Sequence, residues 1–294
     1  YVLCARRTLP EADILVTNAF WAPLLVRDSS HGALYVHVGR YPKGQMKLYS
    51  RAKRLQAPSE AITAAIRCEV PSKADLVKTI SYPLSWDLVE PAPINESREQ
   101  TILYLGRIHP EKGLRELVKA FAGLPDELRK QWRLNIRGPW KVSEGGGGEG
   151  FLENLKDLVG PAKEAIRFLD PVFDDVQLRD ELGRASLFVY PSMAERGETF
   201  GLAALEAMSC GCPPLVSGLG CFRDFVQDGG TGFVFDHRGG NVIMNLRDKM
   251  ADILSKPERL PLIGNAAYKQ AEKFTLETVS KRFLDDFSSI LSAA

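Results

Sequence analysis

The sequence has few cysteines and few histidines for its length, five and four among 294 residues. An odd number of scattered cysteines argues against a disulfide framework and favours a reducing, cytoplasmic setting. The sequence also lacks an apolar run that approaches the ~18 residues of a membrane-spanning helix. We therefore expect neither a disulfide-rich secreted domain nor an integral membrane protein.

An excess of either charge is also missing, because 38 Lys and Arg residues face 37 Asp and Glu residues, for a net charge of +1. Such a chain has no overall field that would attract nucleic acid, and no nucleic-acid-binding motif is recognisable, so we expect no nucleic-acid partner. One segment, residues 40–54, is locally basic and contains Met46, Leu48 and Tyr49. It is either a solvated face or a peripheral contact with anionic lipid or an acidic acceptor.

What the chain does contain is a regular alternation of short apolar runs and amphipathic segments. In an α/β protein this alternation predicts βαβ units and a parallel sheet, with ligands at the carboxyl ends of the strands. Helices are expected at Glu60–Val70, Glu111–Leu124, Gly150–Gly160 and Val176–Ala185. Strands are expected at Asp13–Asn18, Ala33–Val38, Leu76–Leu84, Thr101–Arg107, Trp132–Gly138, Ala165–Val172, Ser186–Ser192 and Thr231–Phe235.

A polar, proline-rich stretch from Pro91 to Gln100 has the composition of a domain linker. We expect an N-terminal domain at residues 1–96, a linker at 97–100 and a C-terminal domain at 101–275. Residues 276–294 are expected to form a final helix that packs back on the N-terminal domain.

Two segments that follow strands carry the residues of a candidate anion site. The first reads GRIHPEKG and contains Arg107 and Lys112. The second contains TFGL, and a helix that begins near Thr199 would point the amides of residues 200–202 out of its N-terminus. Such an end carries roughly half a positive charge and binds anions. Together with the two cations it predicts a diphosphate site that needs no metal.

Two glutamates, Glu198 and Glu206, belong to the same segment. They would lie ~12 Å apart along a helix that rises ~1.5 Å per residue, and on different faces. That separation does not suit a paired acid and base. It suits the two ends of a nucleotide sugar, because carboxylates accept hydrogen bonds from sugar and ribose hydroxyls.

The combination of these segments resembles the donor domain of the retaining glycosyltransferases of family 4, which have the GT-B fold of two Rossmann-like parallel-sheet domains facing a cleft. The matching residues are Gly106-Arg107, Glu111-Lys112-Gly113 and the Glu198-to-Glu206 element with Phe200-Gly201 after its first acid. The resemblance covers residues 101–291.

In that family the Arg and Lys contact the donor diphosphate, which implies this role for Gly106, Arg107 and Lys112. The first Glu and the residues after it hold the transferred sugar, which implies Glu198, Thr199, Phe200, Gly201 and Leu202. The second Glu holds the ribose, which implies Glu206. A strand-end histidine near the reaction centre corresponds to His37. The expected catalytic residues are thus His37, Arg107, Lys112 and Glu198.

The N-terminal region resembles the family's acceptor domain less fully. An opening strand and a glycine-rich loop of the family have no counterpart in residues 1–96. We expect a shortened acceptor domain.

The resemblance implies a hexosyltransferase that retains the anomeric configuration and moves a sugar from a UDP- or GDP-sugar to a hydroxyl of a sugar, lipid-linked or small-molecule acceptor, in glycan, glycolipid or glycoside biosynthesis. The sequence has no Asp-x-Asp triplet, so we expect metal-independent transfer with no cofactor besides the co-substrate. An alternative is a nucleotide-sugar-binding module that is inactive or depends on a partner. The base, the sugar and the acceptor are left open.

Two further patterns have simpler interpretations. Residues 145–150, GGGGEG, satisfy the dinucleotide pattern G-x-G-x-x-G but lie well beyond their strand, so we expect a flexible loop that orders over the donor. The pair Cys210 and Cys212 precedes two prolines, and we expect it to pack at a helix end and not to bind metal.

Overall fold

The computed structural model describes residues 8–9, 11–26, 31–88 and 98–292 and divides into two compact units. Unit 1 comprises Tyr1–Pro83, Arg196–Phe200 and Leu276–Ala294. Unit 2 comprises Leu84–Glu195 and Gly201–Thr275. Each unit contains a parallel sheet, which confirms the α/β class, and each is described by itself.

Unit 2 is built on a six-stranded parallel sheet with the order β10-β9-β8-β5-β6-β7. The chain runs from β5 outward to β6 and β7 and then returns to β8 on the other side of β5, so a topological switch point lies between β5 and β8. Ligands of such sheets bind beyond the carboxyl ends of the strands at this point. The strands are β5 (Glu99–Leu105), β6 (Arg133–Arg137), β7 (Ile166–Leu169), β8 (Ala185–Tyr190), β9 (Pro214–Ser217) and β10 (Phe233–Phe235).

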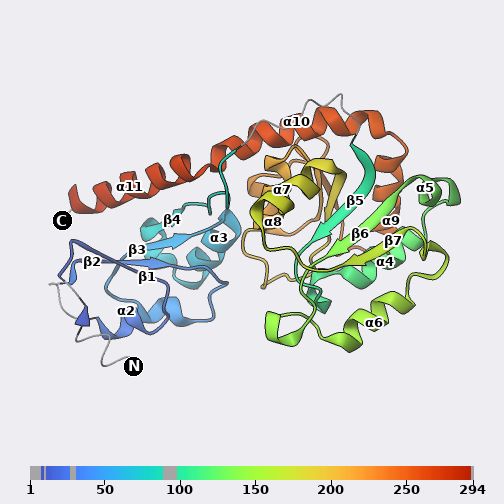
Figure 1. The fold of residues 1–294 in the computed structure, drawn as a ribbon. Helices are drawn as coiled ribbons and strands as arrows, with labels where there is room; N and C mark the ends of the chain where they lie inside the picture. Colours follow the sequence, from blue (N-terminus) through green and yellow to red (C-terminus); the bar gives the residue numbers. More distant parts are fainter. Residues whose placement is uncertain (1–7, 10, 27–30, 89–97, 293–294) are drawn as a thin grey trace. The chain divides into compact units, whose positions relative to one another are not determined.

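Helices cover both faces of this sheet (Figure 1). In α4 the apolar residues Leu114, Leu117, Val118 and Phe121, which are spaced three or four apart, are fully buried. Helix α4 packs against α9, and α8 packs against α10. The helices of unit 2 are α4 (Leu114–Ala122), α5 (Asp126–Gln131), α6 (Glu149–Asp157), α7 (Asp175–Arg184), α8 (Leu202–Ser209), α9 (Val242–Leu254) and α10 (Leu260–Ala271).

Unit 1 contains a four-stranded parallel sheet in the order β1-β2-β3-β4. Helix α3 connects β3 to β4, and its N-terminus is capped by Ser59, whose side chain accepts a hydrogen bond from the amide of Ile62. The elements are β1 (Ile14–Thr17), α2 (Ala22–Leu25), β2 (Ala33–His37), β3 (Ala52–Ala57), α3 (Glu60–Glu69), β4 (Val77–Thr79) and the C-terminal helix α11 (Leu276–Ser292).

Helix α11 is joined to β2 and β3 through the buried carboxylate of Asp286. The hydroxyl of Tyr35 donates to this carboxylate over 3.0 Å, and the Arg54 guanidinium approaches it to 2.8 Å. The Tyr35 ring also packs edge-on against Phe287, with ring centroids 5.0 Å apart. A buried carboxylate is tolerated when a cation and a donor satisfy it in this way. The C-terminal helix is therefore part of unit 1.

Some expected boundaries were wrong. The strand expected at residues 76–84 ends at Thr79, because the ladder to β3 closes with the Ile80 amide on the Ala57 carbonyl and Pro83 has no amide to extend it. In the linker expected at 97–100, Glu99 and Gln100 belong to β5. The chain changes unit after Pro83, and residues 91–97 of the proline-rich stretch lie outside the described residues.

The basic segment at residues 40–54 does not present an apolar face for lipid. Met46 and Tyr49 are buried in the core of unit 1, and the Tyr49 hydroxyl donates to the Phe20 carbonyl. Of the three apolar residues that motivated a membrane contact, Leu48 alone is exposed. The structure therefore gives the membrane interpretation no support.

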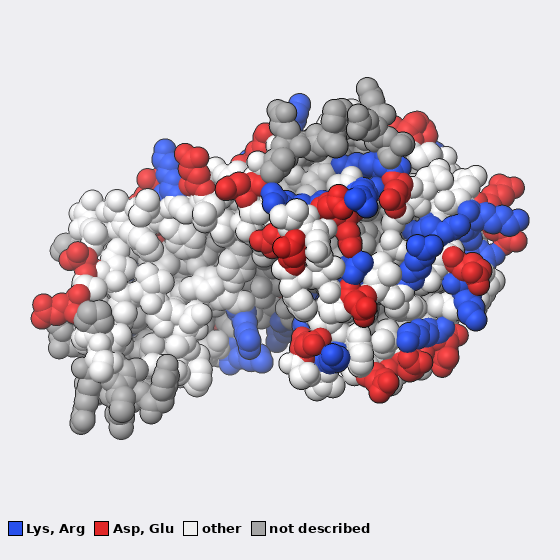
Figure 2. Space-filling view, viewed as in Figure 1, with Lys and Arg blue, Asp and Glu red and all other residues white. Residues whose placement is uncertain are grey.

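The described surface agrees with the balanced charge of the sequence. On the face that Figure 2 shows, Lys and Arg side chains of unit 2 are interspersed with Asp and Glu side chains. None of the helices in the described part of the chain combines the length and the apolar composition needed to span a bilayer.

Candidate functional site

The carboxyl ends of β5 and β6 are brought into backbone contact by two glycines, Gly106 and Gly138. The Gly106 amide donates to the Arg137 carbonyl over 3.2 Å. A Cβ atom on Gly138 would lie 1.9 Å from the Gly106 oxygen, and both residues have positive φ angles, 149° and 154°. Only glycine fits such a close approach. The two glycines leave the strand ends open to a ligand.

Residues 106–113, which we call the phosphate loop, are fixed against the segment that follows β8. Gly113 has a φ of 70°, and a Cβ there would lie 2.1 Å from the Pro191 oxygen. The Met193 amide donates to the Glu111 carbonyl over 2.9 Å. The helix expected from Glu111 begins at Leu114 instead, because left-handed Gly113 separates it from a short 3₁₀ turn at Pro110–Lys112.

Lys112 ends this 3₁₀ turn, and its side chain is buried, with 7% of the residue exposed. Its Nζ lies 5.2 Å from the centroid of the Tyr190 ring. That ring is stacked on Tyr104, with centroids 5.8 Å apart and an interplanar angle of 9°. An aromatic face stabilises a cation that has been removed from water. The ammonium group is thus held in place at the ends of β5 and β8.

Arg107 is held by two neighbours at the surface of unit 2. One guanidinium nitrogen donates to the Gly145 carbonyl over 2.6 Å, and another donates to Glu111 Oε1 over 2.7 Å. Its side chain remains 42% exposed. A ligand phosphate would therefore compete with Glu111 for this cation.

The glycine-rich stretch is packed, which corrects the expectation of a flexible loop. The Gly147 amide donates to the Ile108 carbonyl, and the Gly148 amide donates to the Trp140 carbonyl, over 2.8 and 2.7 Å. A Cβ on Gly146 would lie 2.2 Å from the Trp140 backbone. The glycines serve this close packing, and they lie well beyond the end of β6 at Arg137 and not in a tight strand–helix turn, so the dinucleotide interpretation fails.

The helix of the second motif, α8, begins at Leu202, three residues later than expected. Gly201 is its N-cap with a φ of 90°, and a Cβ at this position would lie 2.3 Å from the Phe222 ring. The left-handed Gly201 prevents Thr199 and Phe200 from joining the helix. The first amides of a helix have no intrahelical partner, here those of Leu202 and Ala203. The candidate anion site predicted for residues 200–202 therefore moves along the chain to Leu202 and Ala203.

Glu206 lies in the second turn of α8, beside a pocket of about 190 Å³ that Trp86, Gly106 and Gly138 also line. We call it the Glu206 pocket. The Ser85 hydroxyl donates to Glu206 Oε1 over 2.5 Å. Burial raises the pKa of this carboxyl above its usual range, with a smaller opposing effect from Ser85. The pocket is smaller than the ~300–1,000 Å³ of a whole small-molecule site, so it fits one portion of a ligand.

The raised pKa of Glu206 leads to a prediction. A carboxyl whose pKa is higher in the folded protein adds stability below its unfolded pKa and loses that stability as the pH rises through the folded value. Glu206→Gln should therefore raise the melting temperature at pH 8, and the gain should vanish at pH 4. Thermal unfolding across this range tests it, with Glu164→Gln on the exposed surface as the matched control. An unchanged melting temperature at pH 8 would contradict it.

Residues Glu198, Thr199 and Phe200 belong to unit 1, whereas Gly201 and Glu206 belong to unit 2. Within unit 1 the Ser59 hydroxyl donates to the Thr199 carbonyl over 2.7 Å. In this division five residues of the domain expected at 101–275, Arg196–Phe200, are grouped with unit 1.

His37 ends β2, and both of its ring nitrogens have partners within unit 1. Nδ1 is hydrogen-bonded to Gln56 Oε1, and Nε2 lies 3.0 Å from the Tyr82 hydroxyl. The histidine borders a pocket of about 590 Å³ beyond the carboxyl ends of β1 and β2. We call it the β2 pocket; its lining includes Asn18, Phe20, Trp21, His37, Arg40 and Tyr82.

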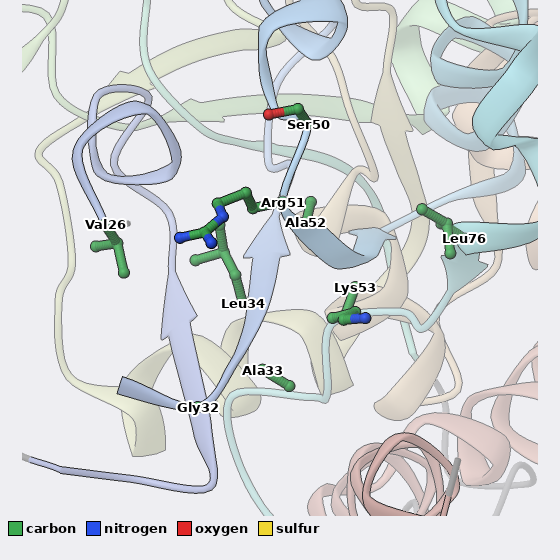
Figure 3. Close-up of a pocket in the computed structure, with 9 residues that line it drawn as sticks. All are labelled: Val26, Gly32, Ala33, Leu34, Ser50, Arg51, Ala52, Lys53 and Leu76. Carbon is green, nitrogen blue, oxygen red and sulfur yellow. The ribbon is translucent and has the colours of Figure 1, made fainter. Parts of the chain in front are cut away.

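A second hollow of unit 1, of about 520 Å³, lies at the amino ends of β2 and β3 (Figure 3). Arg51 and Lys53 are among its lining residues. Parallel sheets bind ligands at the opposite ends of their strands. The β2 pocket is therefore the better candidate for a ligand site in this unit.

Sequence reasoning missed several residues that shape these sites. Gly138 follows β6, and Tyr190 is the last residue of β8. Ligands were expected at the carboxyl ends of the strands, so both residues could have been found by considering every strand end. Glu195 fixes the segment after β8, because it contacts His237 over 2.9 Å and Arg238 over 2.7 Å. Hydrogen bonding from Arg238 lowers the pKa of Glu195. Its partners lie some forty residues later, and no local pattern indicates them.

The cysteine pair behaves as a packing element. Cys212 is buried, and burial raises the pKa of its thiol to about 12. Such a thiol is a poor nucleophile and a poor metal ligand. Among the described residues, no group of His, Cys, Asp and Glu side chains has the geometry to hold a metal ion.

The sequence of this chain matches the model of a known family and the sequences of several known proteins. The family described as "Glycosyl transferases group 1" matches residues 89–270, more than half of the chain. A D-inositol 3-phosphate glycosyltransferase of Streptomyces avermitilis is 34% identical over 194 residues, which are 65% of this chain and 40% of that protein. A protein of the same name from Gordonia bronchialis is 25% identical over 85% of this chain and 55% of its own length. The chain thus spans about half the length of these curated relatives.

Solved structures agree on the fold. Anabaena HepE in complex with UDP and glucose superposes with a TM-score of 0.78 at 19% identity, covering 98% of this chain and 81% of HepE. Sucrose-phosphate synthase from Thermosynechococcus elongatus gives a TM-score of 0.78 at 20% identity, covering 96% and 74%. Two parallel-sheet units, the agreement with these solved structures and the family match lead to one conclusion: the chain belongs to the glycosyl transferases group 1 family and has the GT-B fold.

Proposed function

We propose that this protein is a retaining glycosyltransferase of family 4 that moves a sugar from a UDP- or GDP-sugar to an acceptor hydroxyl without a metal ion. The observation that carries the proposal is that unit 2 holds a buried ammonium, Lys112, over Tyr190 at the end of β8, and a pocket at the end of β5 that Gly106, Ala203 of the first turn of α8 and Glu206 line. A cation and free helix amides suit a diphosphate, and a carboxylate suits hydroxyls.

Each part of the donor would bind the residues of this site that suit its chemistry. The diphosphate would contact Lys112, Arg107 and the first amides of α8, with the Gly106 backbone beside it. The ribose hydroxyls would bind Glu206 in place of the Ser85 hydroxyl. The transferred sugar would contact Glu198 and the backbone of Thr199–Leu202. The structures of HepE with UDP support a nucleotide in a fold of this kind.

The acceptor would bind to the β2 pocket of unit 1. Aromatic Phe20 and Trp21 give apolar faces for a ring, and Asn18 and Tyr82 give polar groups for hydroxyls. Arg40 also lines the pocket and suits an anionic substituent such as a phosphate. Relatives named D-inositol 3-phosphate glycosyltransferase support a phosphorylated polyol as the first acceptor to test.

The reaction would proceed by front-face attack. The bond between the anomeric carbon and the diphosphate oxygen breaks, and the acceptor oxygen forms the new bond on the same face. The acceptor proton passes to an oxygen of the departing phosphate. Negative charge develops on the diphosphate, and Lys112, Arg107 and the helix amides stabilise it more in the transition state than in the ground state.

Release of nucleoside diphosphate tests this proposal. The protein is incubated with UDP-glucose or a GDP-sugar, with and without D-inositol 3-phosphate, and the released diphosphate is measured. Glu198→Ala should lower acceptor-dependent release about 100-fold or more, because the carboxylate no longer binds the transferred sugar in the transition state. Glu149→Ala on α6 is a matched control. Unchanged release by Glu198→Ala would remove Glu198 from the mechanism.

A second candidate is a nucleotide-sugar-binding module without transferase activity, because Lys112, the N-terminus of α8 and the Glu206 pocket would bind a nucleotide sugar whether or not transfer follows. In that case UDP or GDP raises the melting temperature, since a ligand that binds only the folded state stabilises it. Diphosphate release would then stay at the level without enzyme. The two measurements together separate the candidates.

A further inference from the structure

A chain of four groups leads from the backbone of unit 1 into the β2 pocket. The Gln56 side chain is fully buried, and its Nε2 donates to the Ile80 carbonyl over 2.5 Å. Its Oε1 faces His37 Nδ1, and His37 Nε2 faces the Tyr82 hydroxyl at 3.0 Å. Both His37 and Tyr82 line the pocket.

The direction of every hydrogen bond among these four groups follows from the Ile80 carbonyl at the buried end of the series. A backbone carbonyl accepts and cannot donate, so the Gln56 amide nitrogen must face Ile80 and the amide oxygen must face His37. That oxygen also only accepts, so His37 carries its proton on Nδ1. In the neutral ring Nε2 is then an acceptor, and the Tyr82 hydroxyl must donate to it.

The consequence appears at the pocket end of the chain. The single proton of Tyr82 is used in the bond to His37, so its oxygen can offer a ligand only lone pairs. Burial raises the pKa of Tyr82, which keeps this proton on the phenol at neutral pH. The chain therefore presents a hydrogen-bond acceptor to the pocket, which is the group that a hydroxyl donor requires.

One ring contact and one glycine favour this position of Tyr82. Its ring packs edge-on against Phe200, with centroids 5.6 Å apart. A Cβ on Gly39 would lie 3.0 Å from both the Tyr82 oxygen and His37 Nε2. The absence of a side chain at Gly39 thus leaves the end of the chain uncrowded.

We propose that Tyr82 binds a hydroxyl of the acceptor as a hydrogen-bond acceptor, and that Gln56 and His37 are positioning residues that fix the direction of its proton. This inference rests on the proposed function for the identity of the ligand, but the proton direction itself does not. The prediction also revises the role expected for His37, which would act through Tyr82.

The first arm of the test measures the tautomer of His37 by ¹⁵N nuclear magnetic resonance, with signals assigned through a His37→Asn variant. We expect the Nδ1–H tautomer in the unmodified protein and in Tyr82→Phe. Gln56→Met should shift the ring toward the Nε2–H form. Thr63→Val, which removes the 2.6 Å hydrogen bond to Thr79 in the same unit, is the matched control. An Nε2–H ring in the unmodified protein would overturn the proposal.

The second arm titrates the protein with D-inositol 3-phosphate and, separately, with UDP. Tyr82→Phe keeps the ring that packs on Phe200, and it should weaken binding of the inositol phosphate about tenfold, the typical effect of one hydrogen bond. Gln56→Met should weaken it in the same direction, and UDP affinity should not change. Equal affinity in Tyr82→Phe would contradict the role of Tyr82.

The arms separate failure of this inference from failure of the proposed function. If UDP binds but the inositol phosphate does not bind the unmodified protein, the acceptor class is wrong; an Nδ1–H ring then still supports the proton direction. If neither ligand binds, the transferase proposal fails. An Nε2–H ring refutes the chain of hydrogen bonds whatever the ligands do.

Discussion

Replacing Lys112 by Met is expected to lower sugar transfer by about 100- to 1,000-fold, the usual effect of removing one preorganised charge from a transition state. Lys112 is buried, and its ammonium lies over the Tyr190 ring. Because unit 2 already holds this charge in place, no reorganisation is needed when the diphosphate leaves. Met keeps the apolar stem that packs in the loop and removes the charge alone.

The stability of the variant distinguishes a functional cation from a structural one. Removing a charge from a buried position that serves a ligand should leave the melting temperature equal or higher, since the desolvation cost disappears. Lys119→Met on the exposed face of α4 is the matched control and should change neither quantity. A turnover within tenfold of the unmodified protein would contradict the role of Lys112.

Gly138→Ala is expected to destabilise unit 2 more than the addition of a single methyl group at any other position. Its Cβ would lie 1.9 Å from the Gly106 oxygen, and the residue has a φ of 154° that side chains rarely adopt. Backbone strain and overpacking together should cost about 2–5 kcal/mol of unfolding free energy. The phosphate loop must move away to relieve the contact, so the stabilisation of the protein by UDP should also be lost.

Gly183→Ala supplies the control for this prediction. Gly183 lies in α7, and a Cβ there meets nothing within 4 Å. Alanine should stabilise this helix by about 0.5–1 kcal/mol. Denaturant unfolding and thermal shifts with UDP, measured on both variants, test the pair. A Gly138→Ala protein with normal stability and normal UDP binding would show that Gly106 and Gly138 do not need their close contact.

Much of the donor half of the candidate site could be predicted from local patterns. Apolar periodicity identified α4, and the residues Arg107, Lys112 and Glu206 follow strand ends or lie on the helix after one, as expected. Helix starts were less predictable. Helices were expected from Glu111 and from near Thr199, yet Gly113 and Gly201 adopt left-handed conformations, and Pro191 and Phe222 occupy the space that a Cβ atom would need there. Such neighbours are distant in the sequence.

The acceptor half was poorly predictable for a similar reason. His37 was noticed at a strand end, but its partners Gln56 and Tyr82 come from β3 and from the segment after β4. Nothing in the sequence near either residue suggests a shared hydrogen-bond chain. The parallel sheet places these segments together, and the buried Ile80 carbonyl then decides the direction of the protons.

Local sequence patterns were enough to identify the α/β class and the family and to propose the residue types of a donor site, because strand and helix periodicity and short motifs depend on near neighbours. The tertiary structure alone decided which groups face each other: the cation of Lys112 over Tyr190, the contact of Gly138 with Gly106, and the separation of Glu198 from Glu206 between two units. Those pairings depend on close packing between segments far apart in the chain, which local patterns do not record.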